Sequence, residues 1–120
     1  MKQRPLISVI VPTLNEEARI GPVLDEMLSQ QDLDAELEVL VADGGSTDAT
    51  REIVERYARR GNVRLVDNPK RHQAAGFNQA IRQARGSIVC IIHAHATYAK
   101  NYLAACQSAR ERTGAANVGG

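Results

Sequence analysis

The sequence predicts an α/β fold in which a parallel sheet of βαβα units carries helices on both faces. Four short apolar runs rich in Val and Ile support this prediction; they lie at residues 6–11, 37–42, 63–66 and 88–92. The runs barely alternate with polar residues, which is typical of strands buried on both faces. A helical pattern follows each run, and the β-α-β-α-β-α-β-α order implies parallel strands joined by right-handed crossovers.

The first predicted helix follows the first apolar run. Asn15 is expected to be its N-cap, with Glu16 and Glu17 favourably placed in its first turn. The inward stripe follows i, i+3, i+4, i+7, i+8 spacing and consists of Ile20, Val23, Leu24, Met27 and Leu28.

Three more helices are predicted at residues 48–59, 73–85 and 100–112. Ser46 or Thr47 would cap the helix at 48–59, and glycines at 61, 86 and 114 would end the three helices in turn. The side chains expected to point inward are Ile53, Val54, Tyr57, Phe77, Ile81, Ala84, Leu103 and Cys106.

Length and composition favour one domain spanning residues 1–120. Apolar residues make up 43% of the chain, and because only 3% is aromatic, the core must rest on Ile, Val, Leu and Ala. The 15 basic and 14 acidic residues give a net charge of +1, which provides no electrostatic footprint for nucleic acid. Cys90 and Cys106 lack metal-ligand spacing and are expected to be buried free thiols. No stretch approaches the ~20 apolar residues of a membrane span, so a cytoplasmic location is expected.

Polar residues gather where each predicted strand ends, at 12–17, 43–48, 68–72 and 93–95. In open parallel sheets, ligands bind beyond the carboxyl ends of the strands, so these four loops are expected to form one site. Asp43 directly ends a buried strand, and its carboxylate is expected to project into the crevice and accept hydrogen bonds from a base or ribose. Each loop also has a simpler interpretation: a helix cap at Asn15, a tight turn after Asp43, and a solvated surface at 70–72.

Two histidines follow the last apolar run. On an extended segment, His93 and His95 would point the same way and could bind one divalent cation; a structural role is the alternative. The first turn holds no Gly-x-Gly-x-x-Gly and no P-loop, which argues against a dinucleotide fold and a P-loop NTPase. It also lacks the glycine-rich basic loop expected of a nucleotidyltransferase.

Three segments in this order, residues 8–17, 41–48 and 76–81, resemble the GT-A glycosyltransferases of the family 2 type. The resemblance covers nearly the whole chain and implies the Rossmann-like sheet of nucleotide-diphospho-sugar transferases. Residues 68–71, 76–78 and 95–96 are similar to the bacterial exopolysaccharide subgroup related to succinoglycan synthesis.

The resemblance implies a nucleoside-diphosphate sugar as ligand, with UDP-sugar expected, and it implies roles for individual residues. Asp43 would contact the base, Pro12, Thr13 and Glu16 would line the nucleoside pocket, and Arg71 or His72 would lie near the base or diphosphate. The full set of candidate nucleotide-sugar residues is Pro12, Thr13, Asn15, Glu16, Asp43, Gly45, Arg71 and His72.

The histidine pair departs from the family. His93 and His95 fall where the family keeps Asp-x-Asp, the metal and diphosphate motif. Carboxylates suit hard cations whereas imidazole prefers later metals, so Mn²⁺ is expected rather than Mg²⁺. Weak metal binding, or none, is the alternative.

By the same resemblance, the parent protein would catalyse an inverting sugar transfer to a glycan or lipid-linked acceptor in polysaccharide synthesis. The catalytic base of the family would lie beyond Gly120, so the chain is expected to be part of a longer enzyme. The cytoplasmic face of the inner membrane is one expected location for that longer enzyme. A non-catalytic module that binds nucleotide or partner proteins is the alternative. An exposed sheet edge also predicts self-association into homo-oligomers.

Overall fold

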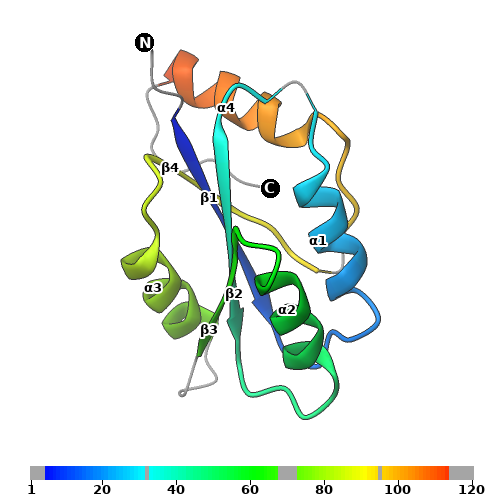
Figure 1. Cartoon of the computed structure of the whole chain (residues 1–120). Helices are drawn as coiled ribbons and strands as arrows, with labels where there is room; N and C mark the ends of the chain where they lie inside the picture. Colours follow the sequence, from blue (N-terminus) through cyan, green and yellow to red (C-terminus); the bar gives the residue numbers. More distant parts are fainter. Residues whose placement is uncertain (1–4, 32, 68–72, 95, 114–120) are drawn as a thin grey trace.

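The structure is a computed structural model, and it describes residues 5–31, 33–67, 73–94 and 96–113 (Figure 1). Eight elements follow one another in the predicted order. They are β1 (Leu6–Thr13), α1 (Ile20–Leu28), β2 (Glu36–Asp43), α2 (Thr50–Ala58), β3 (Val63–Asp67), α3 (Gln73–Gln83), β4 (Ile88–Ile91) and α4 (Tyr102–Thr113).

The described strands form one parallel sheet in the order β3-β2-β1-β4. Strands β1 and β2 are paired over their whole length, so that Thr13 lies beside Asp43 where both strands end. The chain builds outward from β1 to β3 and then crosses to the other side of β1 to form β4. This reversal places a switch in strand order at β1, where ligands bind in folds of this kind.

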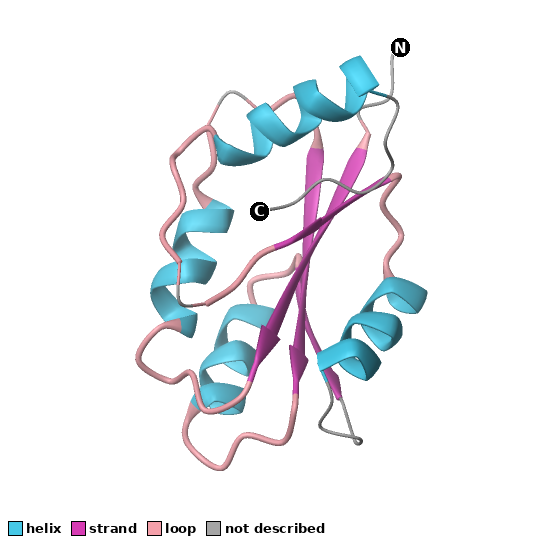
Figure 2. Cartoon of the chain, turned by 180° about the vertical axis from the view of Figure 1, so that it is seen from behind, coloured by secondary structure: helices cyan, strands magenta, loops and turns pink. Residues whose placement is uncertain are grey.

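Helices cover both faces of the sheet, as the sequence predicted. On one face, α1, α2 and α4 pack against β1 side chains such as Val9 and Val11. On the other face, α3 packs through Ala80 against Ile10 and its neighbours. In both views α3 lies across the sheet from α1 and α2 (Figures 1 and 2).

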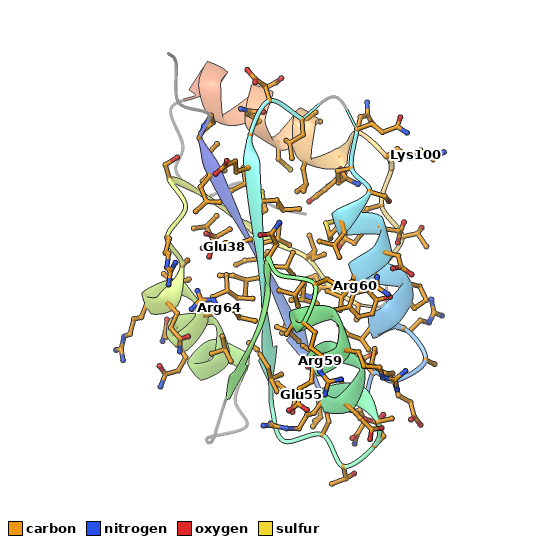
Figure 3. All side chains as sticks on the ribbon, viewed as in Figure 1. Glu38, Glu55, Arg59, Arg60, Arg64 and Lys100 are labelled. Atoms are coloured by element: carbon orange, nitrogen blue, oxygen red, sulfur yellow. The ribbon has the colours of Figure 1, made fainter. Side chains whose placement is uncertain are left out.

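A polar cluster joins the sheet to the connection between α3 and β4. Glu38 on β2 accepts a hydrogen bond from the Ser8 hydroxyl at 2.5 Å and one from the backbone N–H of Arg85 at 2.7 Å. Arg64 on β3 lies 3.5 Å from the same carboxylate and donates to the carbonyl of Gln83 at 2.9 Å (Figure 3). These contacts provide hydrogen-bond partners for the side chains of Ser8, Glu38 and Arg64, away from the predicted site.

The starts of two helices differ from the prediction. Helix α1 begins at Ile20 rather than just after Asn15, and Asn15 instead adopts a left-handed backbone with φ of 53°. Helix α2 begins at Thr50, so neither Ser46 nor Thr47 caps it. The reason is the same in both cases: these polar side chains bond to the neighbouring loop rather than to their own helix.

Two apolar side chains expected to point inward are exposed. Ile81 on α3 is 42% exposed, because Ala80 faces the sheet in its place and Ala84 packs beside it. Leu28, the last residue of α1, is 37% exposed. The side chain of Phe77 lies outside the described residues.

The two cysteines are free and buried, as predicted. Burial, reinforced by the neighbouring Cys106, raises the pKa of Cys90 to about 12, so its reactive thiolate is scarce at neutral pH. Over the described ranges, the structure contains no helix with both the length and the apolar character needed to cross a membrane.

Candidate functional site

The candidate site is built from the two loops that follow β1 and β2. Because these strands are paired in parallel, their carboxyl ends meet at one edge of the sheet, and the loops leave it side by side. The backbone N–H of Gly44 donates to the carbonyl of Thr13 at 2.9 Å, which continues the pairing past the end of the strands. The predicted meeting of residues 12–17 with residues 43–48 is therefore present.

Asp43 lies at the centre of this assembly and is completely buried. Its Oδ1 accepts hydrogen bonds from the hydroxyls of Thr13 at 2.8 Å and Ser46 at 2.5 Å. Its Oδ2 accepts bonds from the backbone N–H groups of Gly45 at 3.1 Å and Ser46 at 2.9 Å, and from Nη1 of Arg51 at 3.2 Å. Thr13 on β1, the turn after β2 and Arg51 on α2 together supply these five donors, and the expected contact of the carboxylate with a ligand stays a prediction.

The hydrogen bonds keep this buried carboxylate ionised. Burial by itself raises the pKa of Asp43, but the bonds from Ser46, Thr13 and Gly45 together lower it below its usual value. Gly45 is suited to its place in the turn because its backbone has φ of 94°, a left-handed conformation that favours glycine.

Asn15 ties the first loop to the second. Its backbone N–H donates to the Ser46 hydroxyl at 2.8 Å, and its side-chain oxygen accepts the backbone N–H of Thr47 at 2.8 Å. Its left-handed backbone, which asparagine tolerates better than most residues, allows both bonds at once. Asn15 was predicted as a site residue, and the structure places it in the first loop, in contact with the second.

A second set of bonds joins Glu16 and Glu17 to the start of α2. The backbone N–H of Glu16 donates to the Thr50 hydroxyl at 2.8 Å. The carboxylate of Asp48 accepts the backbone N–H of Glu17 at 3.2 Å, and the carboxylate of Glu17 accepts that of Ala49 at 3.2 Å. These reciprocal bonds fix the relative position of the loops.

Sequence reasoning missed Thr50 and Arg51, although both contact site residues. The available signal was their position just after the Asp-rich loop, on the first turn of the helix that follows it. Pro12 and Glu16 are half-buried beside the loops. Arg71 and His72 lie outside the described residues, so their predicted place at the site is untested.

A turn follows β4 in the segment that carries the histidine pair. Strand β4 ends at Ile91, and the N–H of Ala96 donates to the carbonyl of His93 at 3.2 Å, which forms a turn. His95 lies outside the described residues, so the expectation that the two imidazoles point the same way stays a prediction.

The residues of this segment can be compared with the ligands that a divalent cation requires. His93 is exposed, and its backbone N–H donates to the Tyr98 hydroxyl at 2.8 Å. In the part of the chain that the structure describes, no three His, Cys, Asp or Glu side chains gather as a metal site. Imidazole nitrogen binds divalent cations of the later metals, so the residue type of His93 is compatible with the expected cation.

Comparison with known proteins gives one consistent result. The model of the family "Glycosyl transferase family 2" matches residues 8–120. The chain is 38% identical over 114 residues to the succinoglycan biosynthesis protein ExoA of Rhizobium meliloti, covering 92% of this chain and 34% of that protein. It is 34% identical over 100 residues to a dolichyl N-acetyl-alpha-D-glucosaminyl phosphate 3-beta-D-2,3-diacetamido-2,3-dideoxy-beta-D-glucuronosyltransferase of Methanococcus voltae, covering 81% and 31%.

Solved structures agree on the fold. Staphylococcus aureus TarS 1-349 superposes with a TM-score of 0.77 at 30% identity, over 88% of this chain and 32% of that one. The mannosyltransferase PcManGT from Pyrobaculum calidifontis, in complex with GDP-Man and Mn²⁺, superposes with a TM-score of 0.71 at 39% identity, over 81% and 29%. The chain thus spans about one third of the length of these relatives.

Proposed function

The chain belongs to glycosyltransferase family 2, and from that premise we propose that it is the donor-binding part of an enzyme that transfers a sugar from a nucleoside-diphosphate sugar. The observation that carries the proposal is the assembly of two loops around Asp43 at the switch in strand order. Hydrogen bonds that already hold the loops support the proposal, because ordering loops during binding would reduce affinity.

The nucleoside would lie against this edge. Pro12, Thr13 and Glu16 would line its pocket, and Asn15 and Gly45 would hold the loops that contact it. Asp43 would accept a hydrogen bond from the base, and Arg71 or His72 would approach the base or diphosphate. A uridine nucleotide is the proposed donor, supported by the related TarS structures with UDP and UDP-GlcNAc.

The cation proposed for this site is Mn²⁺ rather than Mg²⁺, held by His93 and His95. When bound, it would supply Lewis-acid stabilisation of the leaving diphosphate. A related structure, that of PcManGT, contains Mn²⁺ together with GDP-Man, which supports the proposal.

The proposed reaction of the whole protein is an inverting transfer to a glycan or lipid-linked acceptor. The names of the two relatives, a succinoglycan biosynthesis protein and a dolichyl phosphate glycosyltransferase, support this class of acceptor. A base must deprotonate the acceptor hydroxyl, and no described residue is assigned to that role. We therefore expect this chain to bind donor and to turn over poorly.

Calorimetric titration tests the proposal directly. UDP, UDP-GlcNAc and GDP would be titrated into the chain with and without Mn²⁺, and binding of UDP with enhancement by Mn²⁺ is expected. Asp43→Asn should weaken UDP binding roughly 10- to 150-fold, since a hydrogen bond to a charged group contributes about 1.5–3 kcal/mol. Asp25→Asn is the matched control, because Asp25 accepts its bond from Tyr57 on α2 rather than from the loops. Failure of the wild-type chain to bind any nucleotide would refute the donor site.

One observation favours a second function, that of a non-catalytic nucleotide-binding module. His93 and His95 stand where the family keeps two carboxylates, and the chain turns at His93. Such a module would bind UDP equally well with and without Mn²⁺. The two arms of the titration therefore separate the two functions.

A further inference from the structure

The connection from β4 to α4 folds back on its own start. Pairing with β1 continues past β4 to Ile92, whose N–H donates to the carbonyl of Ile10 at 3.0 Å. At His93, the next residue, the hydroxyl of Tyr98 accepts the backbone N–H at 2.8 Å. The carbonyl of His93 accepts the N–H of Ala96 at 3.2 Å. Both backbone polar groups of His93 are therefore bonded within the connection, although the residue is exposed.

The backbone around Tyr98 is held by α1. The N–H of Tyr98 donates to the carboxylate of Glu26 at 2.9 Å. The side chain of Gln30 donates to the carbonyl of Ala99 at 2.9 Å and accepts the backbone N–H of Leu103 at 2.8 Å. These bonds fix the stretch of backbone from which the tyrosine side chain reaches back to the end of β4.

The ring of Tyr98 is held as well. It meets the ring of Tyr102, at the start of α4, with centroids 4.7 Å apart and planes at 61°. Edge-to-face packing of this kind is favoured for aromatic rings, and it restricts the orientations that the Tyr98 ring can adopt. The hydroxyl that contacts His93 is thus carried by a side chain whose backbone and ring both have fixed neighbours.

We propose that Tyr98 is a positioning residue for His93: its hydroxyl fixes the backbone from which the imidazole reaches the cation of the donor site. This inference rests on the proposed function, which assigns His93 to that cation. Without the hydroxyl, the N–H of His93 would bond to water, and the residue would have to be ordered when the cation binds. Groups that orient a metal ligand without touching the metal raise its affinity in this way.

Tyr98→Phe tests the role of the hydroxyl, because it retains the ring that packs on Tyr102. Calorimetry would give the enhancement of UDP affinity by Mn²⁺, which is the ratio of the dissociation constants without and with the metal. The enhancement should fall roughly two- to tenfold, the range expected for the loss of one hydrogen bond between neutral groups. UDP affinity without Mn²⁺ should not change, because the loops around Asp43 keep their bonds.

Tyr102→Phe is the matched control. It makes the same chemical change in the other ring of the pair, and within the described residues the buried Tyr102 hydroxyl makes no hydrogen bond to His93. The enhancement by Mn²⁺ should therefore equal that of the wild type. An equal fall in both variants would show an effect of ring packing alone and would overturn the proposal.

A double-mutant cycle separates positioning of His93 from a general structural role of Tyr98. His93→Ala removes the imidazole but retains the backbone N–H that bonds to the tyrosine hydroxyl. In this background, Tyr98→Phe should lower the enhancement by Mn²⁺ no further. A further fall as large as that in the wild-type background would show that the hydroxyl acts on another part of the connection, and the proposal would be overturned.

A measurement on the unmodified chain does not depend on whether the variants fold. Hydrogen exchange of the His93 amide, followed by NMR without metal or nucleotide, should be slowed, because the Tyr98 hydroxyl accepts this N–H. Exchange at the rate of an unstructured peptide would overturn the proposal. If the wild type bound no UDP, or gained no affinity from Mn²⁺, the proposed donor site or its cation would fail and this inference with it. That outcome is seen in the wild type alone and differs from all of the others.

Discussion

At the scale of single residues, Asp43 illustrates how a buried charge can be tolerated. A carboxylate without water carries a large desolvation cost unless hydrogen bonds or an opposite charge offset it. Here the turn supplies backbone and hydroxyl donors, and Arg51 supplies the opposite charge. Ionisation of Asp43 therefore stabilises this arrangement of the loops, so the stability of the site is linked to the protonation of one residue.

This linkage predicts loss of stability in acid. Because the pKa of Asp43 is lowered on folding from a usual value of 3.8, its ionised form stabilises the folded state above that pH. The contribution disappears as the pH falls below 3.8 and through the lowered pKa. Urea unfolding at pH 5 and pH 3 should show a lower midpoint at pH 3. Asp43→Asn should show a smaller difference between the two pH values than the wild type, and an equal difference would contradict the assignment.

At the scale of elements, the strands were predictable from the sequence, whereas the starts of α1 and α2 were not. The bounds of the apolar runs lie close to the bounds of the observed strands, because strands buried on both faces consist mostly of apolar residues. Asn15, Ser46 and Thr47 have the residue types of helix caps, and a local reading assigns them to their own helices. Their partners lie about 30 residues away, so only the pairing of β1 with β2 reveals them.

The connection between α3 and β4 supplies a prediction at this scale. A Cβ on Gly86 would lie 2.6 Å from both the Leu6 carbonyl oxygen and the Ser8 hydroxyl, and 2.8 Å from the Ser8 nitrogen. Two of these atoms are backbone and cannot move without disturbing β1. Gly86→Ala should therefore lower the free energy of unfolding by about 1–3 kcal/mol, measured by urea denaturation.

Gly21 provides the comparison for Gly86. On α1, its Cβ would meet Tyr57 at 3.8 Å and Ile53 at 4.0 Å, which are ordinary contacts. Gly21→Ala should therefore stabilise the chain by up to about 1 kcal/mol through helix propensity. The close-approach explanation requires the two substitutions to act in opposite directions, and a Gly86→Ala variant as stable as the wild type would disprove it.

At the scale of the whole molecule, the sequence predicts the layers but not the strand order. Alternation of strands and helices indicates a parallel sheet, but several orders satisfy the same pattern. The observed order β3-β2-β1-β4 places β1 between β2 and β4 and creates the switch at its carboxyl end. It also leaves β4 paired only with β1 among the described strands.

An edge of this kind predicts self-association of the chain. Unpaired N–H and C=O groups on an edge strand offer a template for another chain, and β4 carries no charged residue between Ile88 and Ile91. The average mass from sedimentation equilibrium should therefore rise with protein concentration. Ser87→Lys places a charge at the exposed residue just before β4 and should lower that mass. Ser108→Lys adds the same charge at an exposed position of α4 and should not, because it lies off the edge. A mass that stays monomeric at every concentration would show that the edge does not pair with a second chain. Equal effects of the two lysine substitutions would point to general charge repulsion instead.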